Sequence, residues 1–350
     1  MPHRSLLNIG LALLVLLTIL STPSRAGTVF GTDKAWFTLN GQQTFMLGFS
    51  YYGALGAPSE FLRRDLDDMK RFGFNWLRVW ATWGAYDNVV SAVDAQGRPR
   101  EPFMSQLEWL VKECDARGMV VDVTLSRHET EDPERAKGLV PNAQAHRRAV
   151  ESIVQRLKPY RNWYLDLANE HDVGDARRVR AEELRTLRAR VRELDPQRLV
   201  TVSFGGHDLS RENAREVLEV VGVDFLAPHR PRHPGSPKET RAKTRELRDM
   251  AESMGHVVPV MHQEPFRRGY TDWQPTRMDF LTDVTGAREG GAGGWCFHNG
   301  GQRGVEDEQP RRSFDLRERR LLDQLDAEEL EFLKRVGRDV QVTRKPKPTP

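Results

Sequence analysis

Eight short apolar segments recur along the chain, each followed by a loop and a stretch with helical periodicity. Short runs rich in aliphatic and aromatic residues are typical of strands that are buried on both faces of a parallel sheet. We expect these strands at Thr44–Phe49, Asn75–Trp80, Met119–Leu125, Trp163–Ala168, Leu199–Ser203, Val223–Ala227, Val257–Met261 and Ala292–Phe297.

The segments between the strands carry apolar residues at helical spacing, as Leu107, Leu110 and Cys114 do. Helices are expected at Glu60–Phe72, Glu101–Arg117, Asn142–Leu157, Ala176–Leu194, Arg211–Val220, Pro237–Met254 and Thr276–Glu289. Eight strands that alternate with helices predict an α/β fold, a (β/α)8 TIM barrel in one domain. An open doubly wound sheet is the alternative, but the chain lacks a glycine-rich first turn of the dinucleotide-binding type.

Two further segments are predicted to complete the barrel. Residues 28–43 are typical of a short antiparallel flap with Asn40-Gly41 as its turn, and we expect this flap to plug the bottom of the barrel. Leu321 to Val336 is predicted to be a closing helix.

The first 26 residues have the pattern of an export signal. Arg4 gives a positive start, Leu6 to Leu20 is almost wholly apolar, and Ser24-Arg25-Ala26 is a small-x-small cleavage site. The sequence therefore predicts a secreted or periplasmic protein, with an uncleaved membrane anchor as the alternative. The domain boundaries that follow are a signal peptide at 1–26, a barrel domain at 27–340 and a basic, proline-rich tail at 341–350.

The charge balance and the cysteine count narrow the classes of partner. The chain has 53 Lys and Arg against 50 Asp and Glu, and cleavage after residue 26 removes Arg4 and Arg25, which leaves 51 against 50. A net charge of +1 gives no indication of a nucleic acid or an acidic polymer as partner. Cys114 and Cys296 are predicted to be buried free thiols, with a single disulfide as the alternative.

Two of the predicted strands end at a glutamate. Asn169-Glu170 follows the fourth strand, and Glu264 follows the seventh. The carboxyl ends of all the strands meet at one face of a (β/α)8 barrel, which is where active sites lie. A pair of carboxylates at that face is what the cleavage of a glycosidic bond requires.

Four motifs, in the expected order along the chain, resemble the clan A glycoside hydrolases and in particular the cellulase-like family five. Residues 73–80 resemble the second-strand pattern G-x-N-x-x-R, Asn169-Glu170 resembles the pair that carries the acid/base, Glu264 matches the nucleophile, and Gly294-Trp295 resembles the eighth-strand tryptophan. The resemblance implies retaining hydrolysis of an oligo- or polysaccharide, with Glu170 as acid and then base. It implies no organic cofactor and no catalytic metal.

The candidate substrate-binding residues gather at the predicted strand ends. A cation beside a carboxylate lowers its pKa, so Arg78 is expected to keep the nucleophile ionised. Asn169 is expected to donate to the sugar 2-hydroxyl group. The remaining candidates are the histidines His128, His229 and His298 and the aromatic residues Tyr52, Trp80, Trp83 and Trp295.

Other interpretations remain open. The first strand lacks the His-x-His that begins metal-dependent hydrolase barrels, and a phosphate-binding barrel has only the loop Asn299-Gly300-Gly301 in its favour. One departure from the family matters more, because His229-Arg230-Pro231 lacks the tyrosine that usually follows this histidine by two residues. Tyr270 is the candidate to replace it. This departure keeps a second class of function open, a barrel that binds glycans with little turnover.

Overall fold

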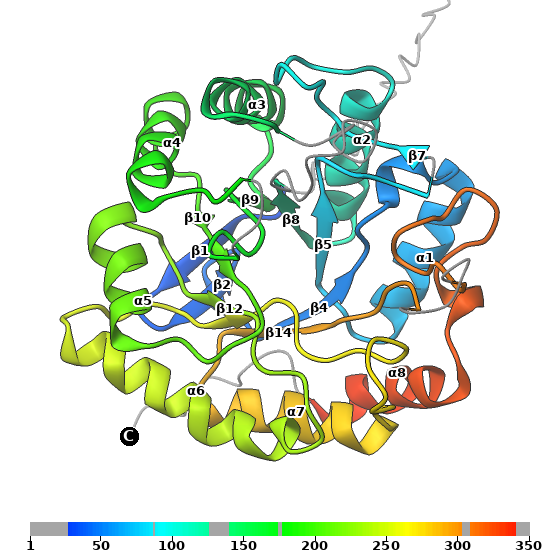
Figure 1. Ribbon diagram of the computed structural model, residues 1–350. Helices are drawn as coiled ribbons and strands as arrows, with labels where there is room; N and C mark the ends of the chain where they lie inside the picture. The colour runs from blue at the N-terminus through cyan, green and yellow to red at the C-terminus, as the bar shows by residue number, and fades with distance from the viewer. Residues whose placement is uncertain (1–26, 87, 126–139, 174–176, 303–308, 341–350) are drawn as a thin grey trace, which may run out of the picture.

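The computed structural model describes residues 27–86, 88–125, 140–173, 177–302 and 309–340. Its centre is a ring of parallel strands that helices surround (Figure 1). In chain order the barrel strands are β4 (Met46–Ser50), β5 (Trp76–Trp80), β8 (Val120–Thr124), β9 (Trp163–Asp166), β10 (Val200–Thr201) with β11 (Ser203–Phe204), β12 (Ala227–Pro228), β13 (Met261–His262) and β14 (Gly294–Phe297).

The strands close on themselves. Seven of them form one sheet in the order β10-β9-β8-β5-β4-β14-β13. The ring is completed where β11 pairs with β12 and where a parallel bridge joins Leu226 to Val260. The predicted (β/α)8 TIM barrel is therefore confirmed.

In the part of the chain that the structure describes, eight helices surround the ring. They are α1 (Ser59–Arg71), α2 (Phe103–Ala116), α3 (Ala143–Leu157), α4 (Ala181–Leu194), α5 (Arg211–Arg215) with a π-helix at Glu216–Val221, α6 (Ser236–Ser253), α7 (Arg277–Gly290) and α8 (Ala327–Asp339). The predicted closing helix starts later than expected because Asp326 caps its first turn, where the Asp326 carboxylate accepts the Glu329 N–H at 3.1 Å. Among the described residues, no helix combines the length and apolarity needed to cross a membrane.

Two predicted strands lie further along the chain than expected. The segments predicted at Val223–Ala227 and Val257–Met261 pair as β12 and β13, which are two residues long and displaced towards the carboxyl end. Pro259 has no N–H to give to a ladder. Its carbonyl instead accepts from Leu226, and the pairing continues from the N–H of Met261 to the Leu226 carbonyl.

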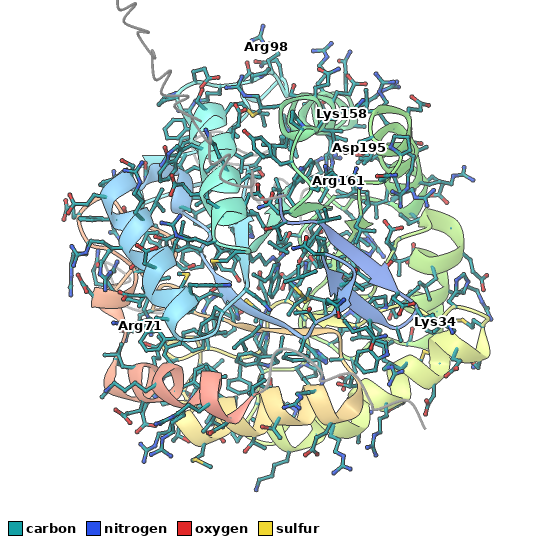
Figure 2. The ribbon with its side chains drawn as sticks, turned by 180° about the vertical axis from the view of Figure 1, so that it is seen from behind. Lys34, Arg71, Arg98, Lys158, Arg161 and Asp195 are labelled. Carbon is teal, nitrogen blue, oxygen red and sulfur yellow. The ribbon has the colours of Figure 1, made fainter. Side chains whose placement is uncertain are left out.

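The predicted flap is present at the bottom of the barrel. It consists of β1 (Phe30–Asp33), β2 (Trp36–Leu39) and β3 (Gln42–Gln43), and Asn40 and Gly41 form its turn with φ angles of 51° and 79°. Figure 2 shows the molecule from behind, with Lys34 of the flap and Arg161, which precedes β9, both labelled. The Phe30 N–H donates to the Arg161 carbonyl and joins the flap to this side of the barrel.

Two aromatic residues of the flap enter the barrel. The Phe37 ring packs edge-on against Phe225 with centroids 5.0 Å apart, and the Phe30 ring lies 5.6 Å from that of Tyr164. Inside this plug the lower barrel is apolar, lined by Met46, Trp76, Val120, Tyr164, Phe225, Met261 and Cys296. Gly48 makes room for the Trp76 ring, since a Cβ atom at Gly48 would lie 1.6 Å from it.

We expect the plug to contribute strongly to stability. Replacing Phe37, which is fully buried, by alanine leaves a cavity and should lower the free energy of unfolding by about 3–5 kcal/mol. Urea denaturation measures this loss, and Thr32→Ala on the exposed part of β1 is the control. A Phe37→Ala loss no larger than the control's would mean that the flap does not seal the core.

Both cysteines are buried and unpaired, as predicted. The predicted signal peptide at 1–26 and the tail at 341–350 lie outside the described residues.

Candidate active site

Arg78 organises the polar layer above the apolar part of the barrel. Its side chain projects inward from β5 and is fully buried. One guanidinium nitrogen, Nη1, donates to Oε1 of Glu264 at 2.6 Å. The other, Nη2, donates to Asn169 Oδ1 at 2.9 Å and to Asp166 Oδ2 at 3.0 Å. The predicted contact between Arg78 and the Glu264 carboxylate is present, and Arg78 also fixes the amide of Asn169.

Glu264 lies two residues beyond the end of β13 and is 5% exposed. Burial alone would raise its pKa. The neighbouring His229 and Arg78 outweigh burial and lower the pKa of Glu264 to about 2. Glu264 is therefore ionised at neutral pH, the state in which a carboxylate acts as a nucleophile.

Glu170 sits where the chain turns after β9. Its φ angle of 47° lies in the left-handed region, and its N–H donates to Ser203 Oγ at 3.1 Å. This turn directs the side chain towards the centre of the mouth, where Oε1 lies 3.0 Å from Nδ1 of His229. The Glu170 side chain is 20% exposed, against 7% for Glu264. The more exposed carboxylate is the better placed of the two to exchange a proton with a leaving group and with water.

His229, which follows β12, connects the two carboxylates. Its Nε2 lies 3.0 Å from Nη1 of Arg78, and because a guanidinium only donates, this nitrogen accepts. Its Nδ1 lies 3.0 Å from Oε1 of Glu170 and 3.6 Å from Oε2 of Glu264. His229 thus lies between Arg78 and the two acids and contacts all three.

The two carboxylates and the histidine lie close together. One oxygen of Glu170, one oxygen of Glu264 and one nitrogen of His229 all lie within 4.8 Å of one another. Such a triad has the spacing of a metal-binding group. However, Glu264 is already bonded to the guanidinium of Arg78, and a divalent cation at this point would be repelled by that charge. The arrangement fits two carboxylates that act directly on a substrate.

Arg232 is a site residue that the sequence analysis missed. Its Nη2 lies 3.4 Å from Oε1 of Glu170 and 3.2 Å from Oε2 of Glu264, so that it bridges the two carboxylates. The ring of Tyr270 lies 5.3 Å from the Arg232 guanidinium. Where the family usually has a tyrosine next to the nucleophile, this chain places a cation. The only signal in the sequence was the departure from the pattern after His229.

His298, predicted from the end of β14, lies at the site. Its Nε2 is 3.8 Å from Oε2 of Glu264 and accepts from Arg267 at 3.1 Å, while Nδ1 donates to the Pro265 carbonyl at 2.6 Å. Burial lowers the pKa of His298 well below its usual value, so the ring is neutral.

The predicted aromatic residues come together at the mouth. Tyr52 stacks on Trp80 with centroids 4.6 Å apart, and Trp80 lies 4.5 Å from Trp83. Phe314, which the sequence analysis did not select, stacks on Tyr52 at 5.3 Å and on Trp83 at 5.0 Å. Tyr52 is only 1% exposed, so Phe314 occupies the ring face that a sugar would need.

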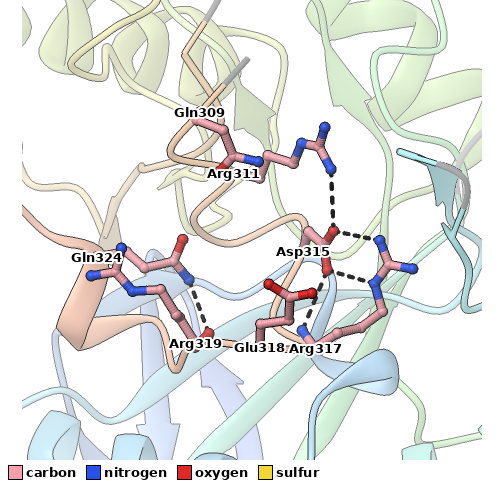
Figure 3. Close-up of a pocket in the computed structure, with 7 residues that line it drawn as sticks. All are labelled: Gln309, Arg311, Asp315, Arg317, Glu318, Arg319 and Gln324. Carbon is pink, nitrogen blue, oxygen red and sulfur yellow. Dashed lines mark hydrogen bonds and ion pairs between the residues drawn. The ribbon is translucent and has the colours of Figure 1, made fainter. Parts of the chain in front are cut away.

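The loop that carries Phe314 has its own polar pocket, shown in Figure 3. Asp315 forms ion pairs with Arg317 at 2.7 Å and with Arg311 at 3.6 Å. The Arg311 guanidinium also lies 4.4 Å from the centre of the Tyr86 ring. The ion pairs lie within the loop, and the contacts of Arg311 and Arg317 with Tyr86 join the loop to the aromatic cluster. The pocket is lined by Gln309, Arg311, Asp315, Arg317, Glu318, Arg319 and Gln324.

The prediction for Trp295 was wrong. Side chains alternate along a strand, and on β14 Cys296 and His298 point into the barrel, so Trp295 points outward. It is fully buried under the helices, where its Nε1 donates to Asp283 of α7 at 2.6 Å and its ring packs on Phe332 of α8. It cannot offer a face to a sugar. The other predicted residue that is not at the described site is His128, which lies outside the described residues.

This correction gives a testable expectation. Trp295→Phe should leave kcat/KM for a glycan substrate unchanged but lower the free energy of unfolding by about 1–3 kcal/mol, because the buried Asp283 carboxyl loses a donor. Thermal unfolding and steady-state kinetics on the same samples separate the two effects. A rise in KM with unchanged stability would restore Trp295 to the substrate site.

Comparison with known proteins gives the family. The family model for cellulase (glycosyl hydrolase family 5) matches residues 33–219, more than half of the chain, and this range includes Arg78 and Glu170. None of the curated proteins gives a significant match. The barrel and the paired glutamates define the class of protein as a glycoside hydrolase. The chain belongs to glycosyl hydrolase family 5, the cellulase family.

Solved structures share the fold at low sequence identity. A Bacteroides vulgatus protein classed as a glycoside hydrolase is 15% identical, with a TM-score of 0.65 over 88% of this chain and 60% of that one. A family 5 mannosidase from Rhizomucor miehei is 14% identical, with a TM-score of 0.62 over 89% of this chain and 97% of that one. An exo-β-1,4-mannosidase from an Opitutaceae bacterium is 18% identical, with a TM-score of 0.58 over 87% of this chain and 61% of that one. The chain thus spans about 60% of the length of the Bacteroides protein.

Proposed function

We propose that the protein hydrolyses O-glycosidic bonds of an oligo- or polysaccharide with retention of configuration. Glu264 is the nucleophile, and Glu170 is the general acid and then the general base. One observation carries the proposal: oxygens of the two carboxylates lie within 4.8 Å of each other across the barrel mouth. Retaining enzymes separate their carboxyl groups by about 5–5.5 Å, whereas inverting enzymes need about 6.5–9.5 Å to admit a water molecule.

The chemistry follows from the environment of each glutamate. Ionised Glu264 attacks the anomeric carbon while Glu170 gives its proton to the leaving oxygen, and a glycosyl ester forms on Glu264. Glu170 then removes a proton from water, which attacks the same carbon and breaks the ester. Arg78 holds Glu264 ionised and Asn169 in place throughout. Asn169 is proposed to donate to the sugar 2-hydroxyl group.

The substrate and the location of the enzyme are also part of the proposal. Solved structures with the same fold include enzymes named for β-1,4-mannan linkages, from Rhizomucor miehei and from an Opitutaceae bacterium. β-1,4-Linked glucans and mannans are therefore the first polymers to test. Residues 1–26 would export the chain, which places it where polysaccharides are found.

A second function, glycan binding with little turnover, has one observation in its favour. Arg232 bonds to both carboxylates and so occupies the gap in which an anomeric carbon must lie. Unless the Arg232 side chain moves aside, a sugar cannot reach Glu264.

Covalent trapping decides between the two functions. The protein is incubated with activated 2-deoxy-2-fluoro glycosides of glucose, mannose and xylose, whose glycosyl esters hydrolyse slowly. A retaining enzyme gains the mass of one fluorosugar on the peptide that contains Glu264. If no peptide is labelled while glycans still bind, the barrel is a binding protein and the hydrolytic proposal fails.

A further inference from the structure

A second guanidinium lies beside the one that bridges the glutamates. The ring of Tyr270 is 5.3 Å from the guanidinium of Arg232 and 4.4 Å from that of Arg267. Arg267 also reaches the catalytic pair through His298, to which its Nη1 donates at 3.1 Å. Two cations thus come together on one side of the mouth, around one aromatic ring.

Neither guanidinium has all of its donors in use. The Nε–H of Arg232 and that of Arg267 are buried and have no hydrogen-bond acceptor among the residues that the structure describes. Arg267 forms no ion pair with a carboxylate in the part of the chain that the structure describes, and burial together with the nearby Arg232 lowers its pKa. Buried charges are normally paired, because an unpaired one forfeits its hydration without compensation. A negatively charged group is therefore the partner that this corner of the site lacks.

We propose that Arg232, Arg267 and Tyr270 form a subsite for an anionic sugar substituent, so that the substrate is a glycan with a carboxylate or sulfate at the scissile linkage. The proposal rests on the hydrolytic function proposed above. A carboxylate or a sulfate fits the planar fork of a guanidinium, which binds such groups through two parallel hydrogen bonds. The ring of Tyr270 contacts both guanidiniums.

The same subsite explains how the gap between the glutamates opens. An incoming anion competes with Glu170 and Glu264 for the N–H groups of Arg232. Once Arg232 turns to the anion, the anomeric carbon can enter the gap between the glutamates. A neutral glycan offers Arg232 no such partner and leaves the bridge closed.

Matched oligosaccharides test the proposal on the unmodified protein. β-1,4-Mannan and β-1,4-mannuronan differ only in the oxidation of C6, as do β-1,4-glucan and β-1,4-glucuronan. O-Sulfated mannan and O-sulfated glucan test the sulfate group in the same way. We expect kcat/KM for at least one anionic member to exceed that of its neutral counterpart by about tenfold or more, the value of one charge-assisted bond. This preference should shrink as salt is raised from about 0.05 to 0.5 M.

Variants of Arg267 test whether this residue causes the preference for anionic glycans. Arg267→Gln should reduce the anionic-to-neutral ratio of kcat/KM at least about tenfold, and Arg267→Lys should restore part of it, since a lysine keeps the charge without the fork. Arg268→Gln is the matched control. It removes the same charge from the adjacent residue, whose guanidinium pairs with Asp326 instead, and it should leave the ratio unchanged.

The outcomes separate this inference from the proposed function. One outcome overturns the anionic subsite and leaves the glycosidase function intact. In it, neutral glycans are cleaved, anionic glycans have no higher kcat/KM, and Arg267→Gln does not change the anionic-to-neutral ratio of kcat/KM. Binding of anionic glycans in calorimetry without cleavage supports the subsite and overturns the hydrolytic function. Failure of every anionic glycan to bind or to be cleaved overturns the subsite.

Discussion

Replacing Glu264 by glutamine is expected to lower kcat on a cleaved glycan by on the order of 10⁴-fold or more, since the amide keeps the volume but cannot act as a nucleophile. Glu170→Gln should cost about 10²–10⁴-fold, the usual contribution of general acid catalysis. Initial rates measure both losses, and circular dichroism shows whether the variants remain folded. Glu239→Gln, at an exposed site on α6, is the control and should retain wild-type turnover.

A chemical rescue makes the assignment of roles specific. In Glu264→Ala, azide can enter the space left by the carboxylate and attack the anomeric carbon from the same side, so that a glycosyl azide of inverted configuration forms. Nuclear magnetic resonance identifies the product. Wild-type rates in either glutamine variant, or azide rescue at Glu170 with inversion, would show that the two roles have been assigned wrongly.

Replacing Arg78 by methionine is expected to be the most destabilising change at the site. Arg78 is fully buried and bonds to Glu264 and Asp166, and its Nε lies 3.4 Å from Asp122. Removing one partner of a buried ionic network leaves uncompensated charge and costs about 3–5 kcal/mol. Urea denaturation should show this loss, with a smaller one for Arg78→Lys, which keeps the charge. Arg64→Met on the exposed face of α1 is the control.

Arg78→Met should also alter how stability and kcat/KM depend on pH. Because the pKa of Glu264 in the folded protein, about 2, is below the unfolded value of about 4.3, its ionisation stabilises the fold above pH ~4.3. That contribution is lost as the pH falls through the folded pKa. Without Arg78 the pKa of Glu264 rises, so both this loss and the acid limb of kcat/KM should move to higher pH. An unmoved acid limb in folded Arg78→Met would show that Arg78 does not control the nucleophile.

The residues that the sequence predicted best are those at strand ends. Asn169, Glu170 and Glu264 each follow a buried apolar run, and a closed barrel brings such positions to one face whatever the loops do. Arg78 lies in the middle of β5 and points into the barrel towards the same site. Trp295 was mistaken because a strand alternates its faces. A slip of one residue in the predicted register turns a side chain from the barrel to the helices.

Arg232, Arg267 and Phe314 escaped prediction for a different reason. They lie in loops after β12, β13 and β14, and their positions depend on contacts between segments far apart in the chain, such as Phe314 with Tyr52. No periodicity identifies such residues. The nearly balanced overall charge was also uninformative, because scattered surface ion pairs conceal a local excess of cations at one point of the mouth.

The flap at the bottom of the barrel also fixes where the described chain begins relative to the mouth. Thr28 donates to Asp115 and Phe30 to the Arg161 carbonyl, so the described chain begins underneath the barrel, on the face opposite Glu170 and Glu264. The first described residues thus close the back of the barrel and take no part in the mouth.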